Sequence, residues 1–280
     1  MDLRIAWLYP DLMSTYGDRG NIICLEKRCQ WRAIEVEVIP VTLETSVAKL
    51  RSCDLIFMGG AQDRQQKLVS EDFLKRKGLI VKEMVEAGIP ALFVCAAYQF
   101  VGHYYKPYKG EEIAGAGIFD LYTEHPGDQA KRLIGNVVAE VISPLSSRVR
   151  SDGVAIPSRE IASSRTPRND NTIVGFENHG GRTYLGSKMT PLAKVIHGFG
   201  NNGEDGFEGA VYKNSIGSYF HGPLLPKNPH IADWLIAKAL EVKYKKQIPL
   251  KPLDDSLEWQ AHRFVIRSGL IHFAPSGFAV

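Results

Sequence analysis

Cys95 is the residue of this sequence whose local pattern best fits a nucleophile. It follows an apolar run at residues 91–94, which predicts a buried strand, and no turn signal follows it before Gly102, which predicts a helix. A cysteine at a sharp turn from strand to helix is exposed above the sheet edge, and the helix N-terminus lowers the pKa of its thiol. The alternative is that Cys95 is a small buried hydrophobic residue, as most free cysteines are.

A thiolate that attacks an amide needs a general base within hydrogen-bond reach, usually a histidine. Among the eight histidines, His221 is the best candidate because it ends an expected strand and precedes a Gly-Pro turn. His179, in a glycine-rich turn, is the second candidate. His103 lies on the same expected helix as Cys95 and should point away from it. A histidine between a strand and a proline-containing turn can also be purely structural.

The oxyanion that forms during such an attack needs hydrogen-bond donors. We expect the backbone N–H of Ala96 and one from the pair Gly59-Gly60, where the missing side chains permit close approach. The glycine pair ends an apolar run at residues 54–58, just as Cys95 ends its own run. Because ligands collect at the carboxyl ends of parallel strands, the glycine pair and Cys95 should be neighbours in space. The alternative for the glycine pair is an ordinary tight turn.

The order of the expected strands and helices around these residues predicts an α/β fold with a mainly parallel central sheet flanked by helices. Strands alternate with helical segments, which indicates βαβ units. The expected strands of the first half are at residues 3–9, 35–41, 54–58 and 91–94, and its helices begin near residues 22 and 69. The second half predicts strands at 137–142, 172–178, 210–212 and 215–220, and helices at 228–246 and 254–266.

The domain prediction is one domain over residues 1–250, with residues 251–280 as a helical tail packed on it. Residues 144–171 are rich in Ser, Arg, Pro and Asp without a clear period, so we assign them to a surface insertion. We find no internal repeat.

Composition argues against several classes of protein. The 280 residues include 34 Lys and Arg against 31 Asp and Glu. This balance gives no net electrostatic field that would attract nucleic acids or a membrane surface. No apolar run approaches the length of a membrane span, and the N-terminus lacks the plan of a signal peptide. The four cysteines have no metal-ligand spacing and are too few for a disulfide scaffold. We therefore expect a cytoplasmic protein with free thiols, no metal and no cofactor.

Eight short motifs, taken in order, resemble class I glutamine amidotransferases of the cobyric acid synthase type. Within that family the pattern is most similar to the GatD-type glutaminase subunits of lipid II isoglutaminyl synthase. The motifs are LYPDLM (8–13), YGDRGN (16–21), GGAQD (59–63), CAAYQFVG (95–102), KRLIGN (131–136), FENHGGRT (176–183), HGPLLP (221–226) and LDDSLE (253–258).

The resemblance implies a flavodoxin-like domain in which Cys95 attacks the side-chain amide of L-glutamine and releases ammonia, with His221 as acid and base. It implies a heterodimer with a MurT-like, ATP-dependent Mur ligase that uses the ammonia to amidate the D-glutamate of lipid II. The runner-up functions are an ammonia donor for cobyrinate-type amidation and a catalytically weak subunit that only binds a ligase. The further site residues implied are Gly60 and Ala96 in the oxyanion hole, Arg132 on the α-carboxylate of the substrate, and Gln99 and Gly59 as other substrate contacts.

Two departures from the family pattern concern the site. The family elbow reads Cys-Gly-Gly, whereas here Ala96 and Ala97 follow the cysteine, and an alanine at positive φ would cost about 1 kcal/mol or more. The usual His-x-Glu is absent after His221. We therefore expect the partner ligase to supply the carboxylate that orients His221, with Glu177 as the first candidate within this chain.

Overall fold

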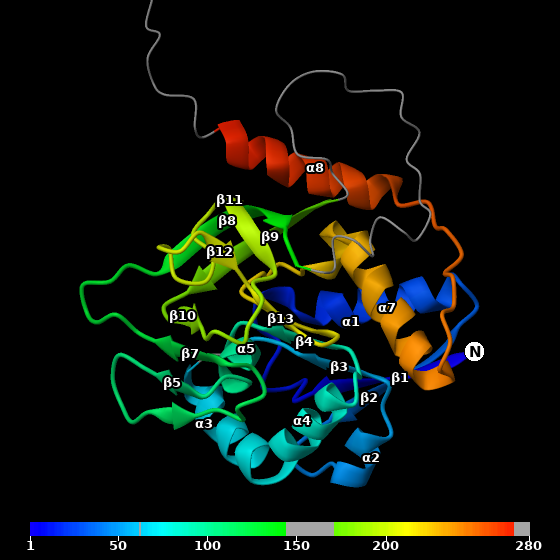
Figure 1. Ribbon diagram of the computed structural model, residues 1–280, viewed down its shortest axis with the longest axis horizontal. Coiled ribbons are helices and arrows are strands. Elements are labelled where there is room, and N and C mark those ends of the chain that lie inside the picture. The colour runs from blue at the N-terminus through cyan, green and yellow to red at the C-terminus, as the bar shows by residue number, and fades with distance from the viewer. Residues whose placement is uncertain (62, 144–170, 272–280) are drawn as a thin grey trace, which may run out of the picture.

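A six-stranded sheet between two layers of helices forms the centre of the protein in this computed structural model, which describes residues 1–61, 63–143 and 171–271 (Figure 1). Five neighbouring strands are parallel, and the strand at one edge runs antiparallel to them. This confirms the predicted α/β class. In spatial order the strands are β13 (Ala210–Tyr212), β14 (Ser215–Ser218), β4 (Ala91–Val94), β3 (Leu55–Met58), β1 (Asp2–Leu8) and β2 (Glu35–Val41).

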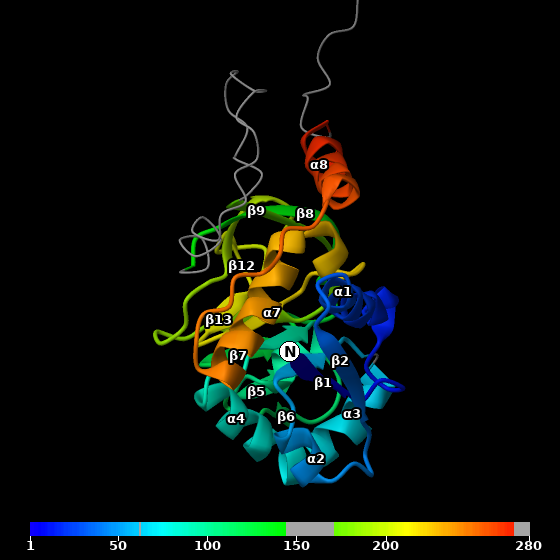
Figure 2. The ribbon, with the colours of Figure 1, turned by 90° about the vertical axis from the view of Figure 1, so that its right-hand side faces the viewer.

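Helices cover both faces of this sheet, so its central strands are apolar throughout. Every residue of β3 and β4 is buried. Successive residues of a strand face opposite sides, and Leu92 accordingly packs in one core cluster and Phe93 in the other. One face is covered by α1 (Arg19–Gln30) and α7 (Pro229–Tyr244), and the other by α2 (Val47–Arg51), α3 (Asp63–Asp72), the π-helical segment η2 (Phe73–Lys77) and α4 (Gly78–Glu86) (Figure 2).

Two further four-stranded sheets lie outside the central one, and the strands predicted at 137–142 and 172–178 are confirmed within the second of them. One contains β10 (Arg182–Leu185), β7 (Leu121–Glu124), β5 (Tyr104–Lys106) and β6 (Ile113–Ala114). The other contains β12 (Phe207–Glu208), β11 (Ala193–His197), β8 (Leu133–Val141) and β9 (Thr172–His179). The remaining short elements are η1 (Thr15–Gly17), α5 (Ala96–Phe100) and η4 (Leu225–Lys227).

The C-terminal helix α8 (Ser256–Ile271) confirms the predicted closing helix and crosses the outer face of β8 and β9 (Figures 1 and 2). Ile266 packs there on Val138 and Val174. The start of α8 is held by Arg28 of α1, whose buried guanidinium donates to Asp255 at 2.6 Å and to Asp233 of α7 at 2.6 Å. Because a buried charge is costly without a partner, this network ties three segments of the chain together.

The predicted insertion at 144–171 lies outside the described residues except for residue 171. Among the helices that the structure does describe, none combines the length and apolar composition that crossing a membrane requires.

Two buried histidines make the packing of α8 sensitive to acid. His230 of α7 stacks on Trp259 of α8, with ring centroids 5.3 Å apart. His262 of α8 donates from Nδ1 to the carbonyl of Lys227 at 2.7 Å, so its Nε2 accepts the Thr172 hydroxyl at 2.9 Å. Burial lowers the pKa of His230 to about 3 and that of His262 to about 4.

Both histidines are therefore neutral in the folded state, while an unfolded chain binds protons below about pH 6.5. We expect the free energy of unfolding to fall as the pH drops from about 6.5 to about 4, by about 2 kcal/mol per histidine at pH 5. Denaturant titrations across this range measure the slope. His262→Gln should flatten it, whereas the control Leu257→Gln, at an exposed and uncharged position of the same helix, should leave it unchanged. An equal slope in His262→Gln would contradict the assignment.

Candidate active site

The carboxyl ends of β3, β4 and β14 bring the glycine pair, Cys95 and His221 together. These strands are neighbours and parallel, so their ends meet at one edge of the sheet. A Cβ atom at Gly60 would lie 2.7 Å from Cε1 of His221 and 3.3 Å from Cβ of Cys95. The predicted proximity of the glycine pair and Cys95 is thereby confirmed. Position 60 must be glycine because any side chain would collide with the histidine ring.

Cys95 occupies a strained turn between β4 and α5. Its backbone has φ 54° and ψ −106°, a conformation that costs a residue with a side chain about 1–3 kcal/mol. The turn is held at both ends, since Cys95 N donates to Ser218 O at 2.9 Å and Gln99 N donates to Cys95 O at 3.1 Å. Ala96 and Ala97 adopt helical conformations in α5. The prediction of strain at the alanines is therefore wrong: the strained residue is the cysteine itself.

His221 is fully buried and interacts with the thiol of Cys95. Burial disfavours the imidazolium, but the charge of Cys95 and the hydrogen bonds with Asp18 and Cys95 outweigh it and raise the pKa of His221 to about 10. Near neutral pH the ring is thus protonated and lies in hydrogen-bond contact with Cys95. This pair provides a nucleophile together with a proton donor for a leaving group.

Asp18 supplies the carboxylate that was expected from a partner. Its Oδ1 accepts a hydrogen bond from Nδ1 of His221 at 3.1 Å, and both side chains have no exposed surface. A carboxylate on Nδ1 fixes the tautomer and orientation of the imidazole and stabilises its cation. The expectation that the third group comes from the ligase is therefore corrected. Glu177 does not take this place either, because its oxygens accept the N–H groups of Phe199 at 2.7 Å and Gly200 at 3.0 Å.

Asp18 also binds the glycine pair. Its Oδ2 accepts the backbone N–H of Gly60 at 2.7 Å. Gly60 therefore does not offer a free donor to an oxyanion in this arrangement, contrary to prediction. Ala96 begins α5, so its N–H has no acceptor one turn back within the helix, and its oxyanion role stays a prediction. A Cβ at Gly59 would lie 2.6 Å from Met13 O, which explains that glycine without a substrate contact.

Gln99 and the second histidine candidate belong to a buried polar network next to the thiol. Gln99 Nε2 donates to the hydroxyl of Tyr219 at 3.2 Å, and this hydroxyl lies 2.6 Å from Thr183 Oγ1. The ring of His179 stacks on that of Tyr219 at 3.6 Å. Burial lowers the pKa of His179, and its Nδ1 donates to Gly181 O. His179 therefore supports Tyr219 and does not act as the base.

The histidine expected to point away from Cys95 is engaged elsewhere. His103 Nε2 lies 2.9 Å from Asp120 Oδ1, and its side chain is half exposed.

Arg132 lies at the surface, at the start of β8. Its Nε donates to Asn178 Oδ1 and its Nη2 to Asn178 O, both at 2.9 Å. Nη1 comes within 3.4 Å of a Cβ built at Gly180. Its role on the substrate α-carboxylate stays a prediction. Within the described ranges, no group of three or more His, Cys, Asp or Glu side chains is arranged to hold a metal ion.

Two solved structures align with most of this chain. The chain aligns with a Trypanosoma brucei CTPS glutaminase domain with bound acivicin at a TM-score of 0.52, with 13% identity over 90% of this chain and 98% of that one. It aligns with the structure of PurLQS from Thermotoga maritima at a TM-score of 0.50, with 13% identity over 88% of this chain and 100% of that one. At this identity the likeness establishes the fold alone.

Sequence comparison identifies the family. Two GatD subunits of glutamine-hydrolysing lipid II isoglutaminyl synthase are similar to the chain. The one from Staphylococcus aureus is 40% identical over 95% of both chains, and the one from Streptococcus pneumoniae is 34% identical over 91% of this chain and 87% of its own. A cobyric acid synthase of Pelotomaculum thermopropionicum is 28% identical over 84% of this chain but only 40% of its own length. Residues 4–229 match the CobB/CobQ-like glutamine amidotransferase domain, so the chain belongs to that family.

Proposed function

We propose that this chain hydrolyses L-glutamine to glutamate and ammonia at Cys95, as the glutaminase subunit of a lipid II isoglutaminyl synthase. The observation that carries the proposal is the arrangement of half-buried Cys95 with fully buried His221 and Asp18 at the edge of the sheet. Near full-length similarity to two GatD subunits supports it. The strain at Cys95 argues against a subunit that only binds a ligase, since strained backbone is retained where a function requires it.

The proposed chemistry starts from a thiolate at Cys95 beside protonated His221. The thiolate of Cys95 attacks the side-chain carbonyl carbon of glutamine, and the C=O electron pair moves to the oxygen, where the Ala96 N–H stabilises it. His221 donates its proton to the amide nitrogen, the C–N bond breaks, and ammonia leaves a γ-glutamyl thioester. Neutral His221 then accepts a proton from water as the water attacks the thioester. Glutamate leaves, and the thiolate and imidazolium are restored.

The ammonia is used by a separate, MurT-like ligase that activates the D-glutamate carboxyl group of lipid II with ATP. The sequence itself has no P-loop. Arg132 holds the α-carboxylate of glutamine, and Gln99 provides a further substrate contact.

The test measures ammonia release and lipid II amidation by the purified chain, alone and with the ligase. Since Asp18 lies within the chain, we expect measurable glutaminase activity without the ligase, and amidated lipid II only with the ligase, ATP and glutamine present. Amidation of cobyrinate in place of lipid II would support the runner-up. Absence of ammonia release from both preparations would leave only the binding-subunit function.

A further inference from the structure

Arg182 carries a buried positive charge next to the proposed carboxylate clamp. The residue is 8% exposed, and burial lowers the pKa of its guanidinium. Nη1 donates to Gly180 O at 2.9 Å and Nη2 donates to Lys131 O at 2.7 Å. Within the part of the chain that the structure describes, these partners are carbonyl groups and not carboxylates. Such a buried cation is costly, so its orientation calls for an explanation.

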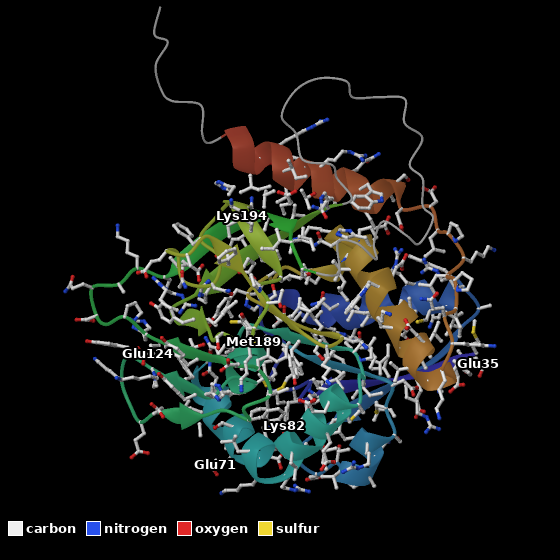
Figure 3. The ribbon with its side chains drawn as sticks, in the orientation of Figure 1. Glu35, Glu71, Lys82, Glu124, Met189 and Lys194 are labelled. Atoms are coloured by element: carbon white, nitrogen blue, oxygen red, sulfur yellow. The ribbon has the colours of Figure 1, made fainter. Side chains whose placement is uncertain are left out.

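A carboxylate is available across the sheet, and Arg182 does not use it. Arg182 of β10 lies directly opposite Glu124 of β7 in the antiparallel register. Opposite charges in that position usually attract each other. Glu124, labelled in Figure 3 at the outer side of this sheet, instead accepts the hydroxyl of Tyr104 at 3.0 Å. The guanidinium of Arg182 turns toward the segment that leads into β8.

The turn at Gly180 and Gly181, which precedes Arg182, is held in place by close packing and a hydrogen bond. A Cβ at Gly181 would lie 2.6 Å from Thr123 Cγ2 and 3.0 Å from Gln99 Nε2, so the backbone is packed closely on both residues. His179 Nδ1 donates to Gly181 O at 2.8 Å. Arg182 therefore links a fixed turn, pressed against Gln99, to the carbonyl of Lys131.

Lys131 immediately precedes Arg132, whose guanidinium is exposed and bonded to Asn178. We infer that Arg182 is a positioning residue for glutamine binding: it fixes the backbone at Lys131 and so holds Arg132 in place for the α-carboxylate of the substrate. The inference rests on the proposed function, because it requires Arg132 to bind that carboxylate. Arg182 acts through Arg132 and does not touch the substrate.

A double-mutant cycle on glutamine affinity tests this inference. In a Cys95→Ala background, which binds without turnover, calorimetry gives the Kd for L-glutamine. Arg132→Ala should raise Kd by about 10- to 100-fold, the effect of losing a charged hydrogen bond. Arg182→Ala should raise it by about 10-fold. The double variant should match Arg132→Ala within about threefold, because residues that act through one another are not additive.

A double variant that shows the product of both effects would overturn the inference, since Arg182 would then bind the substrate by itself. An unchanged Kd in Arg182→Ala would overturn it as well. L-Glutaminamide, which lacks the α-carboxylate, separates positioning from general damage to the fold. Its Kd should be nearly the same in all variants if only the carboxylate clamp is affected.

Arg182→Lys keeps the charge but offers fewer donors in a different geometry, so it should recover only part of the glutamine affinity. It can replace Arg182→Ala in the cycle if the alanine variant does not fold. Arg76→Ala is the control, because Arg76 also donates to a carbonyl, that of Leu43 at 2.7 Å, and its other hydrogen bond goes to Asp72, which is not a residue of the site. It should bind glutamine like the parent.

If the Cys95→Ala chain binds no glutamine, alone or with the ligase, the proposed function fails and the inference with it. An additive cycle overturns the inference only.

Discussion

Cys95→Ser is expected to abolish glutamine hydrolysis while the protein keeps its fold. A serine hydroxyl stays protonated where a thiol beside an imidazolium ionises, so the ion pair with His221 cannot form. Loss of the nucleophile in comparable enzymes costs ~10⁴-fold or more in kcat, and we expect a loss of that order. The change in volume is small, so the free energy of unfolding should move by no more than about 1 kcal/mol. Ammonia release and denaturant titration measure the two quantities.

Cys53→Ser is the matched control. Cys53 is a buried free thiol whose pKa is raised to about 12 by burial, so it is protonated at neutral pH. Its replacement should leave turnover unchanged, and iodoacetamide should label Cys95 but not Cys53 in the folded protein. Turnover in Cys95→Ser at the parental rate would make Cys95 a structural residue and contradict the mechanism.

The parts of this site that could be predicted from the sequence depend on local signals. Cys95 follows four apolar residues and a glycine-proline turn, and this pattern already indicates a strand that ends in an elbow. The glycine pair ends another such run. Because parallel strands order their ends along one edge, these two local patterns were enough to predict that the residues meet.

The parts that could not be predicted depend on contacts distant in sequence. Asp18 lies 203 residues from His221, in a polar segment that carries no hydrophobic period. Its proximity to His221 follows from how the turn after β1 folds back toward Gly60, where Thr15 N donates to Gly60 O at 3.2 Å. The motif YGDRGN contains Asp18, so the resemblance marked the segment without assigning the residue a role.

Backbone geometry explains the error about strain. The Cys-Ala-Ala sequence indicates a sharp turn between strand and helix. The residue of this turn that takes positive φ depends on how the strand joins the helix. The structure places that conformation at Cys95, and α5 begins at Ala96. The two additional sheets were not predicted, although strands were expected at 137–142 and 172–178, because most of their other strands have only two to four residues, too few for a period to appear.

Asp18→Asn is expected to reduce kcat by ~10³-fold or more, with a smaller effect on the KM for glutamine. Asp18 accepts two hydrogen bonds, one from His221 and one from Gly60 N–H. Asparagine has nearly the same shape but only one oxygen, so its NH₂ group must face one of these two donors. Loss of the equivalent carboxylate from a catalytic triad misorients the imidazole and costs about 10⁴-fold.

The pH profile of kcat distinguishes this role from a merely structural one. The carboxylate of Asp18 helps to raise the pKa of His221 to about 10, so its removal lowers that pKa. The imidazolium that protonates the leaving amide nitrogen then loses its proton at a lower pH. The alkaline limb of the profile should therefore shift to lower pH. Asp11 is an exposed carboxylate in the same loop, so Asp11→Asn is the control and should keep the parental profile.

An Asp18→Asn chain that is inactive alone but fully active with the ligase would show that the partner provides a carboxylate after all. Inactivity in both preparations means that Asp18 alone orients His221 and that the glutaminase carries its complete catalytic set.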